Sequence, residues 1–200
     1  MNENLINSLA EQKIFPIIRS NDPDVVVNTV EAILKGGLEI MEVNVESPLI
    51  YDAINSVSKH AKICAGGIIT SMQAHAAIMA GAKCISSPIF HMNLVKLSKD
   101  KKIPYIAGTS TANEAYEAWK ARIPLVKIYP ITALGGPLYI EDLRRPMPFL
   151  NVMPQGNVKL SEVKSYINAG ATAVGVGRDL YEGFSYSEIT ERVKEAIAML

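Results

Sequence analysis

Residues 124–130 read PLVKIYP, an apolar run with proline at both ends. The β-prone residues around Lys127 predict a short buried strand. A lysine is rarely buried without a partner or a task, because removing an ammonium group from water is costly unless the group is paired or neutralised. A buried amine in its neutral form can attack a carbonyl group. Two interpretations of Lys127 are therefore open: a nucleophile, or an outward-pointing residue in a salt bridge or in solvent.

The PLVKIYP run is one of eight apolar, strand-like runs that recur along the chain. The predicted strands are residues 14–19, 38–46, 62–69, 83–90, 103–108, 124–130, 149–154 and 172–177. Helical patterns lie between them, and residues 2–12 predict a short helix ahead of the first strand. The one longer connection covers residues 131–148, directly after the lysine strand.

Capping signals mark several of the expected helices. Asp22 followed by Pro23 indicates a helix start, and Gly36-Gly37 indicates its end. The sequence TANE at residues 111–114 has the form of a capping box. The other helices are expected at residues 48–58, from about 70 to 80–82, at 92–100, 111–122 and 160–169, and in a last segment that carries Ile189, Val193, Ile197 and Leu200 on one face.

Alternating strands and helices indicate parallel βα units. Open doubly wound sheets usually contain fewer strands, and no GxGxxG turn follows the first strand. We therefore predict a (β/α)8 TIM barrel that forms a single compact domain over residues 1–200. This length is at the lower limit for the fold, so most loops must be short.

Composition excludes several classes of protein. The chain has 20 basic and 20 acidic residues, net charge zero and no basic run, which argues against nucleic acid as a partner. The first residues lack the pattern of a signal peptide, and no apolar run approaches the ~20 residues that span a bilayer. Cys64 and Cys84 lie in strand-like runs without metal-ligand spacing, and we interpret them as reduced core residues. A cytoplasmic enzyme or binding protein is expected.

In a (β/α)8 barrel the active site lies where the strands end. Glu42 stands between Met41 and Val43 in the second predicted strand, and a buried carboxylate needs a cation or a function. Glu42 and Lys127 can act as base and nucleophile in Schiff-base chemistry, or form an inert buried ion pair. Strands four and five are expected to contribute little chemistry. Other residues at the strand ends are Arg19, Asn44, Glu46, Ser87, Pro88, Gln155, Gly156, Asn157, Gly175, Gly177 and Arg178.

Glycines after strands seven and eight are a second signal, because barrel loops at this position often bind phosphate through backbone N–H groups. Gly156 and Gly177 permit close approach of the backbone. Arg178 can add a bidentate phosphate contact, or form a surface pair with Asp179 or Glu182. His60 and His75 are expected on helix surfaces, and His91 near the rim.

An ordered set of motifs from about residue 13 to 180 resembles the KDPG/KHG aldolases, which are class I aldolases. The matching motifs are Glu42-Val43 after Gly36-Gly37, Gly81-Ala82 leading to Ser87-Pro88, Ile103-Pro104 leading to Gly108 and Glu114, and residues 126–130 (VKIYP) followed by Gly135-Gly136. The resemblance implies a (β/α)8 barrel, usually assembled as a homotrimer, that needs neither a cofactor nor a metal ion. It makes Lys127 the Schiff-base lysine and Glu42 the general acid/base, acting on a 2-keto-3-deoxy-6-phosphogluconate-like substrate or on 4-hydroxy-2-oxoglutarate to give pyruvate and an aldehyde.

The resemblance is weaker in the groups that bind substrate. Where the family typically continues T-L-R after Glu42-Val43, residues 44–46 read NVE, so an arginine that helps to hold the substrate carboxylate is replaced by Glu46. The family's G-A-G-T is AGGI at residues 65–68, its P-T-G-G is PQGN at 154–157, and Arg178 replaces a small residue. Arg19 is the candidate replacement for the lost arginine. The expected substrate-binding residues are Arg19, Pro88, Gln155, Gly156, Asn157, Gly177 and Arg178.

Two other functions remain possible from the sequence. One is a phosphate-binding barrel isomerase or synthase in which Lys127 and Glu42 move protons without a covalent intermediate. The other is a barrel without turnover that only binds a sugar phosphate.

Overall fold

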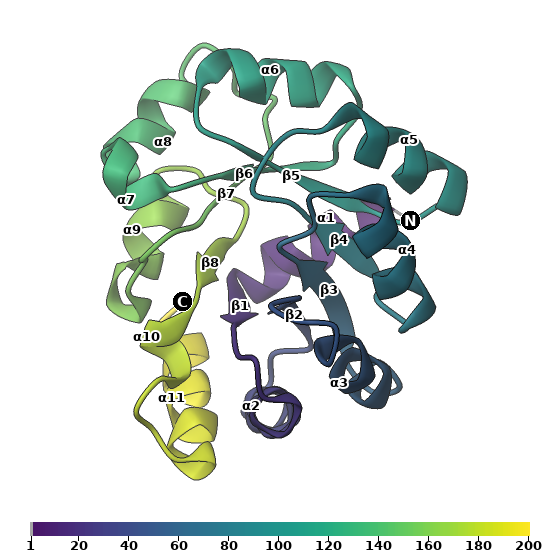
Figure 1. Cartoon of the computed structure of the whole chain (residues 1–200). Helices are drawn as coiled ribbons and strands as arrows, with labels where there is room; N and C mark the ends of the chain where they lie inside the picture. Colours follow the sequence, from purple (N-terminus) through teal and green to yellow (C-terminus); the bar gives the residue numbers. More distant parts are fainter. Residues whose placement is uncertain (1) are drawn as a thin grey trace.

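The computed structural model describes residues 2–200, and the side chains of residues 5–200. Short strands alternate with helices, and Figure 1 shows the helices arranged around the central strands. The strands are β1 (Ile14–Ile18), β2 (Ile40–Asn44), β3 (Lys62–Gly66), β4 (Cys84–Ser86), β5 (Tyr105–Thr109), β6 (Leu125–Ile128), β7 (Val152–Pro154) and β8 (Val174–Val176).

All strand pairs are parallel, in the spatial order β7-β6-β5-β4-β3-β2-β1-β8. The two outer strands of this order meet through a parallel bridge between Gln155 and Gly175. The Thr172 N–H also donates to the Val152 carbonyl at 2.9 Å. The sheet therefore closes on itself, and the predicted (β/α)8 barrel is confirmed.

Several strands are shorter than the apolar runs that predicted them. β3 ends at Gly66 and β4 at Ser86, whereas the runs continue to Ile69 and Phe90. The run ends lie in loops, where Ile69 is 49% and Ile89 47% exposed. Apolar composition alone does not distinguish a buried strand from an apolar loop that follows it.

The helices confirm the expected alternation and include three, within residues 131–148 and 178–181, that the sequence patterns did not predict. They are α1 (Asn2–Gln12), α2 (Pro23–Gly36), α3 (Ile50–Val57), α4 (Ser71–Met79), α5 (Met92–Lys101), α6 (Ala112–Lys120), α7 (Ile131–Leu134), α8 (Pro137–Arg144), the 3-10 turn η1 (Leu160–Glu162), α9 (Val163–Asn168), α10 (Arg178–Tyr181) and α11 (Tyr186–Ala198). The connection 131–148 is not a plain loop, because it contains α7 and α8. Gly135 and Gly136, both with positive φ, separate these helices. No helix within residues 2–200 has the length and apolar character that crossing a membrane requires.

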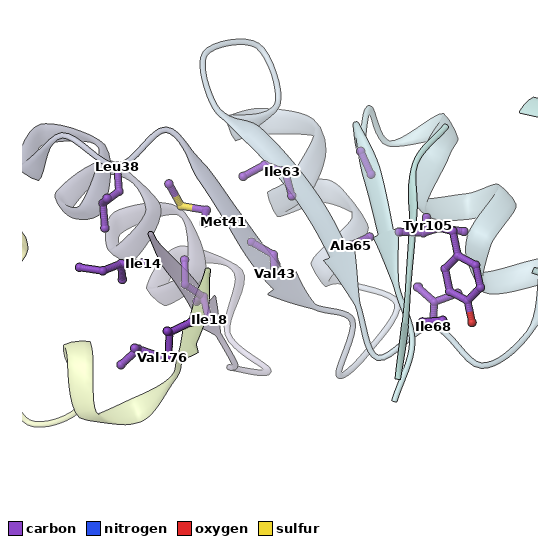
Figure 2. Close-up of a cluster of buried hydrophobic side chains, with 14 of the residues drawn as sticks. Ile14, Ile18, Leu38, Met41, Val43, Ile63, Ala65, Ile68, Tyr105 and Val176 are labelled. Carbon is purple, nitrogen blue, oxygen red and sulfur yellow. The ribbon is translucent and has the colours of Figure 1, made fainter. Parts of the chain in front are cut away.

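Two apolar layers build the barrel. Outward-facing strand side chains pack under the helices, and Figure 2 shows part of this layer, including Met41, Val43 and Ile63. A second cluster fills the barrel interior with Phe15, Ile17, Ile40, Cys64, Cys84, Ile106, Leu125, Met153 and Ala173. Leu9 of α1 belongs to this interior cluster, and α1 lies behind the strands in Figure 1. The helix closes the end where the strands begin, which leaves the opposite end for a site.

The predicted capping box at the start of α6 is present. Thr111 Oγ1 accepts from the Glu114 N–H at 3.3 Å, and Glu114 Oε2 accepts from the N–H groups of Ser110 and Thr111 at 2.8 and 2.9 Å. The hydrogen bond from Ser110, followed by those from Thr111, lowers the pKa of Glu114 below its usual 4.5. This cap holds the turn between β5 and α6 at the end of the barrel that carries the site.

The cap predicts a pH-dependent contribution to stability. A carboxyl whose pKa is lowered by folding stabilises the fold above its unfolded-state pKa, and this contribution is lost as the pH falls through the folded-state value. We expect Glu114→Gln to lower the melting temperature at pH 7 by roughly 1–3 °C. The difference from wild type should shrink steadily below pH 4.5 in thermal unfolding scans. Glu195→Gln, at an exposed site on α11, is the matched control, and a Glu114→Gln deficit that persists at low pH would contradict the assignment.

Candidate active site

One cavity of about 940 Å³ opens where the strands of the barrel end. All nine residues selected from the sequence line it: Arg19, Glu42, Pro88, Lys127, Gln155, Gly156, Asn157, Gly177 and Arg178. Asn44, Tyr129, Lys159, Tyr181 and Arg192 also line the cavity. The residues selected because they follow or end the barrel strands therefore do lie together in the fold.

Lys127 points into the barrel. Leu125, two residues earlier in β6, lies in the interior cluster, whereas Val126 and Ile128 pack under the helices. The Lys127 side chain is 4% exposed, and its Nζ lies 3.8 Å from Glu42 Oε2. The outward-pointing alternative for this lysine is therefore excluded.

Ser86 is the closest polar partner of the lysine. Lys127 Nζ donates a hydrogen bond to Ser86 Oγ at 2.7 Å, and both groups are buried. Strand four thus contributes a polar contact to the lysine that the sequence analysis did not anticipate. Cys84 and Ser86 are two residues apart in β4, so both face the barrel interior. The sequence could have indicated this contact, because Ser86 is a polar residue at the inward position nearest the end of the strand.

Strand β5 contributes space rather than a functional group. A Cβ at Gly108 would overlap the backbone of Ser87 and Pro88. Only glycine lets this loop cross the strand end so closely.

Glu42 and Asn44 lie side by side on the inner face of β2. A Cβ added at Gly66 of β3 would overlap both Glu42 Oε1 and Asn44 Oδ1, so the two side chains occupy the space above that glycine. Glu42 Oε2, Asn44 Oδ1 and Gln155 Nε2 are buried and have no hydrogen-bond partner among the described residues. Buried polar atoms without a partner in the protein can form hydrogen bonds with a ligand.

The two cysteines lie in the barrel interior, closer to the start of the strands than Asn44 and Ser86. Cys64 and Cys84 are opposite one another in the β3–β4 register, and both are buried free thiols, as expected. Burial, reinforced by a hydrogen bond with Cys84, raises the pKa of Cys64 well above its usual 9.0. The thiol therefore stays protonated at neutral pH and does not compete with Lys127 as a nucleophile.

Arg19 forms an ion pair at the rim of the cavity. Its Nε lies 3.1 Å from Glu46 Oε1, and its backbone N–H donates to the Tyr181 hydroxyl at 3.0 Å. The arginine expected to hold a substrate carboxylate is thus already paired with a carboxylate of the chain. Ile68, at the position of the family's threonine, is fully buried under the helices and does not line the cavity.

The loops after β7 and β8 lie next to each other, because Gln155 bridges to Gly175. Gly156 has φ +114°, and a Cβ there would lie 3.0 Å from Pro130 Cα. Arg178 lines the cavity and also stands 4.0 Å from Glu182, so the predicted surface partner is Glu182. The Asp179 carboxylate instead accepts from the Leu160 N–H at 2.8 Å.

The histidines take no part in the cavity. His60 pairs with Glu31, His75 is exposed on α4, and the His91 ring nitrogen Nδ1 accepts from the Asn93 N–H at 3.2 Å to cap α5. Within residues 2–200, no group of three or more His, Cys, Asp or Glu side chains is arranged to hold a metal ion.

Comparison with known proteins gives consistent matches. A sequence model of the family described as "KDPG and KHG aldolase" matches residues 5–194. The 2-dehydro-3-deoxy-phosphogluconate aldolase of Haemophilus influenzae is 28% identical over 99% of this chain and 97% of that protein. The 2-dehydro-3-deoxy-6-phosphogalactonate aldolase of Escherichia coli is 28% identical over 84% of each chain.

Solved structures share the fold. A KDPG aldolase from Legionella pneumophila, captured with pyruvate as a covalent carbinolamine, superposes with a TM-score of 0.88 at 23% identity, over 96% of this chain and 97% of that one.

Proposed function

The chain belongs to the KDPG and KHG aldolase family, and from this premise we propose that it is a class I aldolase. In this proposal it cleaves a 2-keto-3-deoxy sugar acid, phosphorylated or not, or 4-hydroxy-2-oxoglutarate, to pyruvate and an aldehyde. The observation that carries the proposal is a buried lysine 3.8 Å from a buried glutamate, both of which line the cavity at the end of the barrel where the strands finish.

Lys127 would act as the nucleophile. Its neutral amine attacks the C2 carbonyl of the 2-oxo acid to form a carbinolamine. Protonation of the carbinolamine hydroxyl, with Glu42 as the acid, lets it leave as water, and the resulting iminium ion withdraws electrons from C3. The hydrogen bond to Ser86 at 2.7 Å fixes the position of Nζ. The buried apolar residues Cys64, Ile106 and Leu125 close the barrel interior below the amine.

Glu42 would act as the general acid and base. At 3.8 Å its Oε2 is within ion-pair distance of Lys127 but makes no direct hydrogen bond with it. The carboxylate therefore keeps an acceptor position for the proton that the C4 hydroxyl loses when the C3–C4 bond breaks.

The far end of the substrate would lie at the loops after β7 and β8. Gly156, Asn157 and Gly177 bring backbone close to the cavity, and Lys159, Arg178 and Arg192 add positive charge at its rim. Such a set suits a phosphate or a second carboxylate. Arg192 is held in place, because it donates to the Asp179 carbonyl at 2.8 Å.

The Schiff base can be trapped directly. We expect incubation with pyruvate and borohydride to add the mass of a reduced pyruvate adduct at Lys127, located by peptide mass spectrometry. Lys127→Met should give neither adduct nor turnover, whereas Lys194→Ala, at an exposed lysine of α11, should behave as wild type.

Failure of trapping separates the alternatives. If pyruvate and a panel of 2-oxo acids and ketoses give no adduct but a sugar phosphate is converted, the chain is a non-covalent isomerase or synthase. Ligand-induced thermal stabilisation without any product would indicate a binding protein.

The Arg19–Glu46 pair predicts weak binding of the substrate carboxylate, because that carboxylate must compete with Glu46 for Arg19. We expect Glu46→Gln to lower the pyruvate concentration for half-maximal trapping by roughly 3–10-fold, and Glu46→Arg at least as much. Glu39→Gln breaks a similar 3.1 Å pair with Lys62 at the other end of β2 and is the control. Weaker trapping in Glu46→Gln would mean that Glu46 orients Arg19 or contacts the substrate.

We also propose that the chain forms the homotrimer that the family resemblance implies. The loops after β2, β3 and β4 and the first turns of α4 and α5 carry exposed apolar side chains, here named the apolar rim patch: Leu49, Ile69, Met72, Ile89 and Met92. Met72 is 82% exposed, and an apolar surface of this kind favours an interface. A trimer would bury the patch between copies.

Light scattering tests this assembly. Wild type should have three times the mass of one chain, and Met72→Lys combined with Met92→Lys should lower it. Met199→Lys, at a 59% exposed methionine after α11, should leave the mass unchanged. A monomeric wild type would contradict the proposal.

A further inference from the structure

We propose that Asn44 is a positioning residue for the proton transfer: its side-chain oxygen, next to Glu42, binds the O–H group whose proton Glu42 accepts. That O–H belongs to a water molecule or to the C4 hydroxyl of the substrate. This inference rests on the aldolase function proposed above and extends it to a residue with no role so far.

Strand geometry places Asn44 with Glu42. The two residues are separated by Val43, which packs under the helices, so both face the interior of the barrel. Their exposed fractions are 3% and 2%, and both line the cavity.

Gly66 brings the two side chains to the same point. Asn44 and Gly66 are partners in the β2–β3 register, and a Cβ on Gly66 would overlap both Asn44 Oδ1 and Glu42 Oε1. The amide oxygen and the carboxylate therefore lie side by side above the glycine. A larger residue at position 66 would separate them.

Both side chains present acceptors that lack donors. Asn44 Oδ1 and Glu42 Oε2 are buried without a hydrogen-bond partner among the described residues. Lys127 does not supply one, because its Nζ donates to Ser86 and stays 3.8 Å from Glu42. Asn44 Oδ1 lies beside Glu42 Oε1, the other oxygen of the same carboxylate. Buried acceptors without donors are unfavourable, and an O–H group bound between Asn44 and the Glu42 carboxylate would relieve this. The ligand or its water must therefore provide that group.

A purely structural role does not account for this arrangement. The residues that fill the barrel floor on the same strand face, such as Ile40, are apolar. A carboxamide that only filled space would be less stable than an aliphatic side chain of similar volume.

The chemical step is ordinary aldol cleavage. The C4 hydroxyl loses its proton to Glu42, directly or through the bound water. The electron pair of the C3–C4 bond forms the C2–C3 double bond of the enamine, the iminium nitrogen becomes neutral, and C4 becomes the aldehyde carbonyl. Asn44 Oδ1 accepts from this O–H before the transfer, and afterwards from the second O–H of the water or from the protonated Glu42. Asn44 exchanges no proton.

The test compares Asn44→Ala, Asn44→Asp and Asn44→Leu with wild type. Asn44→Leu keeps the volume of the side chain if the alanine variant folds poorly, and thermal unfolding monitors folding of each. Asn151→Ala removes an exposed amide at the start of β7, away from the cavity, and is the control. The measurements are kcat and KM for cleavage, borohydride trapping at Lys127, and exchange of the pyruvate C3 protons with deuterium oxide followed by NMR.

We expect Asn44→Ala and Asn44→Leu to lose roughly 10–100-fold in kcat, with KM and trapping within about 3-fold of wild type. Asn44→Asp keeps the acceptor and should recover part of the loss. In the Asn44→Asp variant, the acid limb of the pH–rate profile should move to higher pH, because a second carboxylate next to Glu42 disfavours the charged form of Glu42. The other titratable groups facing this point, Lys127 of β6 and Cys64 of β3, are unchanged in the variant.

The exchange measurement distinguishes the two sources of the O–H group. Pyruvate has no C4 hydroxyl, so slow exchange in Asn44→Ala assigns the group to water, whereas normal exchange with slow cleavage assigns it to the substrate hydroxyl.

Three results would overturn the inference. One is wild-type kcat in both Asn44→Ala and Asn44→Leu while Lys127 still traps pyruvate, which would leave the aldolase function intact. A second is an Asn44→Asp variant as slow as Asn44→Ala, which would make the amide a hydrogen-bond donor to Glu42. The third is a wild-type protein without adduct or turnover, which would overturn the proposed function as well.

Discussion

The contact between Lys127 and Glu42 in the barrel interior is the interaction on which the site depends. Either side chain, buried with its charge unpaired, would be unfavourable without the other, and Lys127 Nζ also donates a hydrogen bond to Ser86. β2 and β6 are not neighbours in the sheet, since β3, β4 and β5 stand between them. The two side chains can meet only across the interior of a closed barrel, so closure of the sheet is a condition for the chemistry.

The interior changes character along the barrel axis. Leu9 and the side chains around Phe15 fill the end where the strands begin, and polar side chains follow at the end where they finish. Glycines make room at that end: Gly66 lies under Glu42 and Asn44, and Gly108 lies under the loop at Pro88. A small barrel therefore combines a packed floor with a cavity of about 940 Å³.

The inner part of the site, with Lys127 and Glu42, matches the aldolase family, whereas several residues at the rim of the cavity do not. Lys127 and Glu42 occupy the positions that the family motifs predict. At the rim, Glu46 pairs with Arg19, and Ile68 is buried away from the cavity. In the proposed reaction, proton transfer and covalent chemistry would depend on Lys127 and Glu42, whereas the choice of substrate would depend on the residues at the rim. Rim residues that differ from those of the family are compatible with the family's reaction acting on a different 2-oxo acid.

The sequence by itself determined the eight strands, their alternation with helices that predicts a barrel, and the cap of α6, because alternation and capping are local properties of the chain. It left open whether Lys127 points inward. It did not reveal Ser86 as the partner of Lys127, the Arg19–Glu46 pair, or the placement of Asn44 beside Glu42 over Gly66. It also missed the two helices within residues 131–148 and the short helix α10. These features were decided only by the tertiary structure, since the register between strands and the closure of the barrel fix which inward side chains meet, and neither is encoded in any one strand.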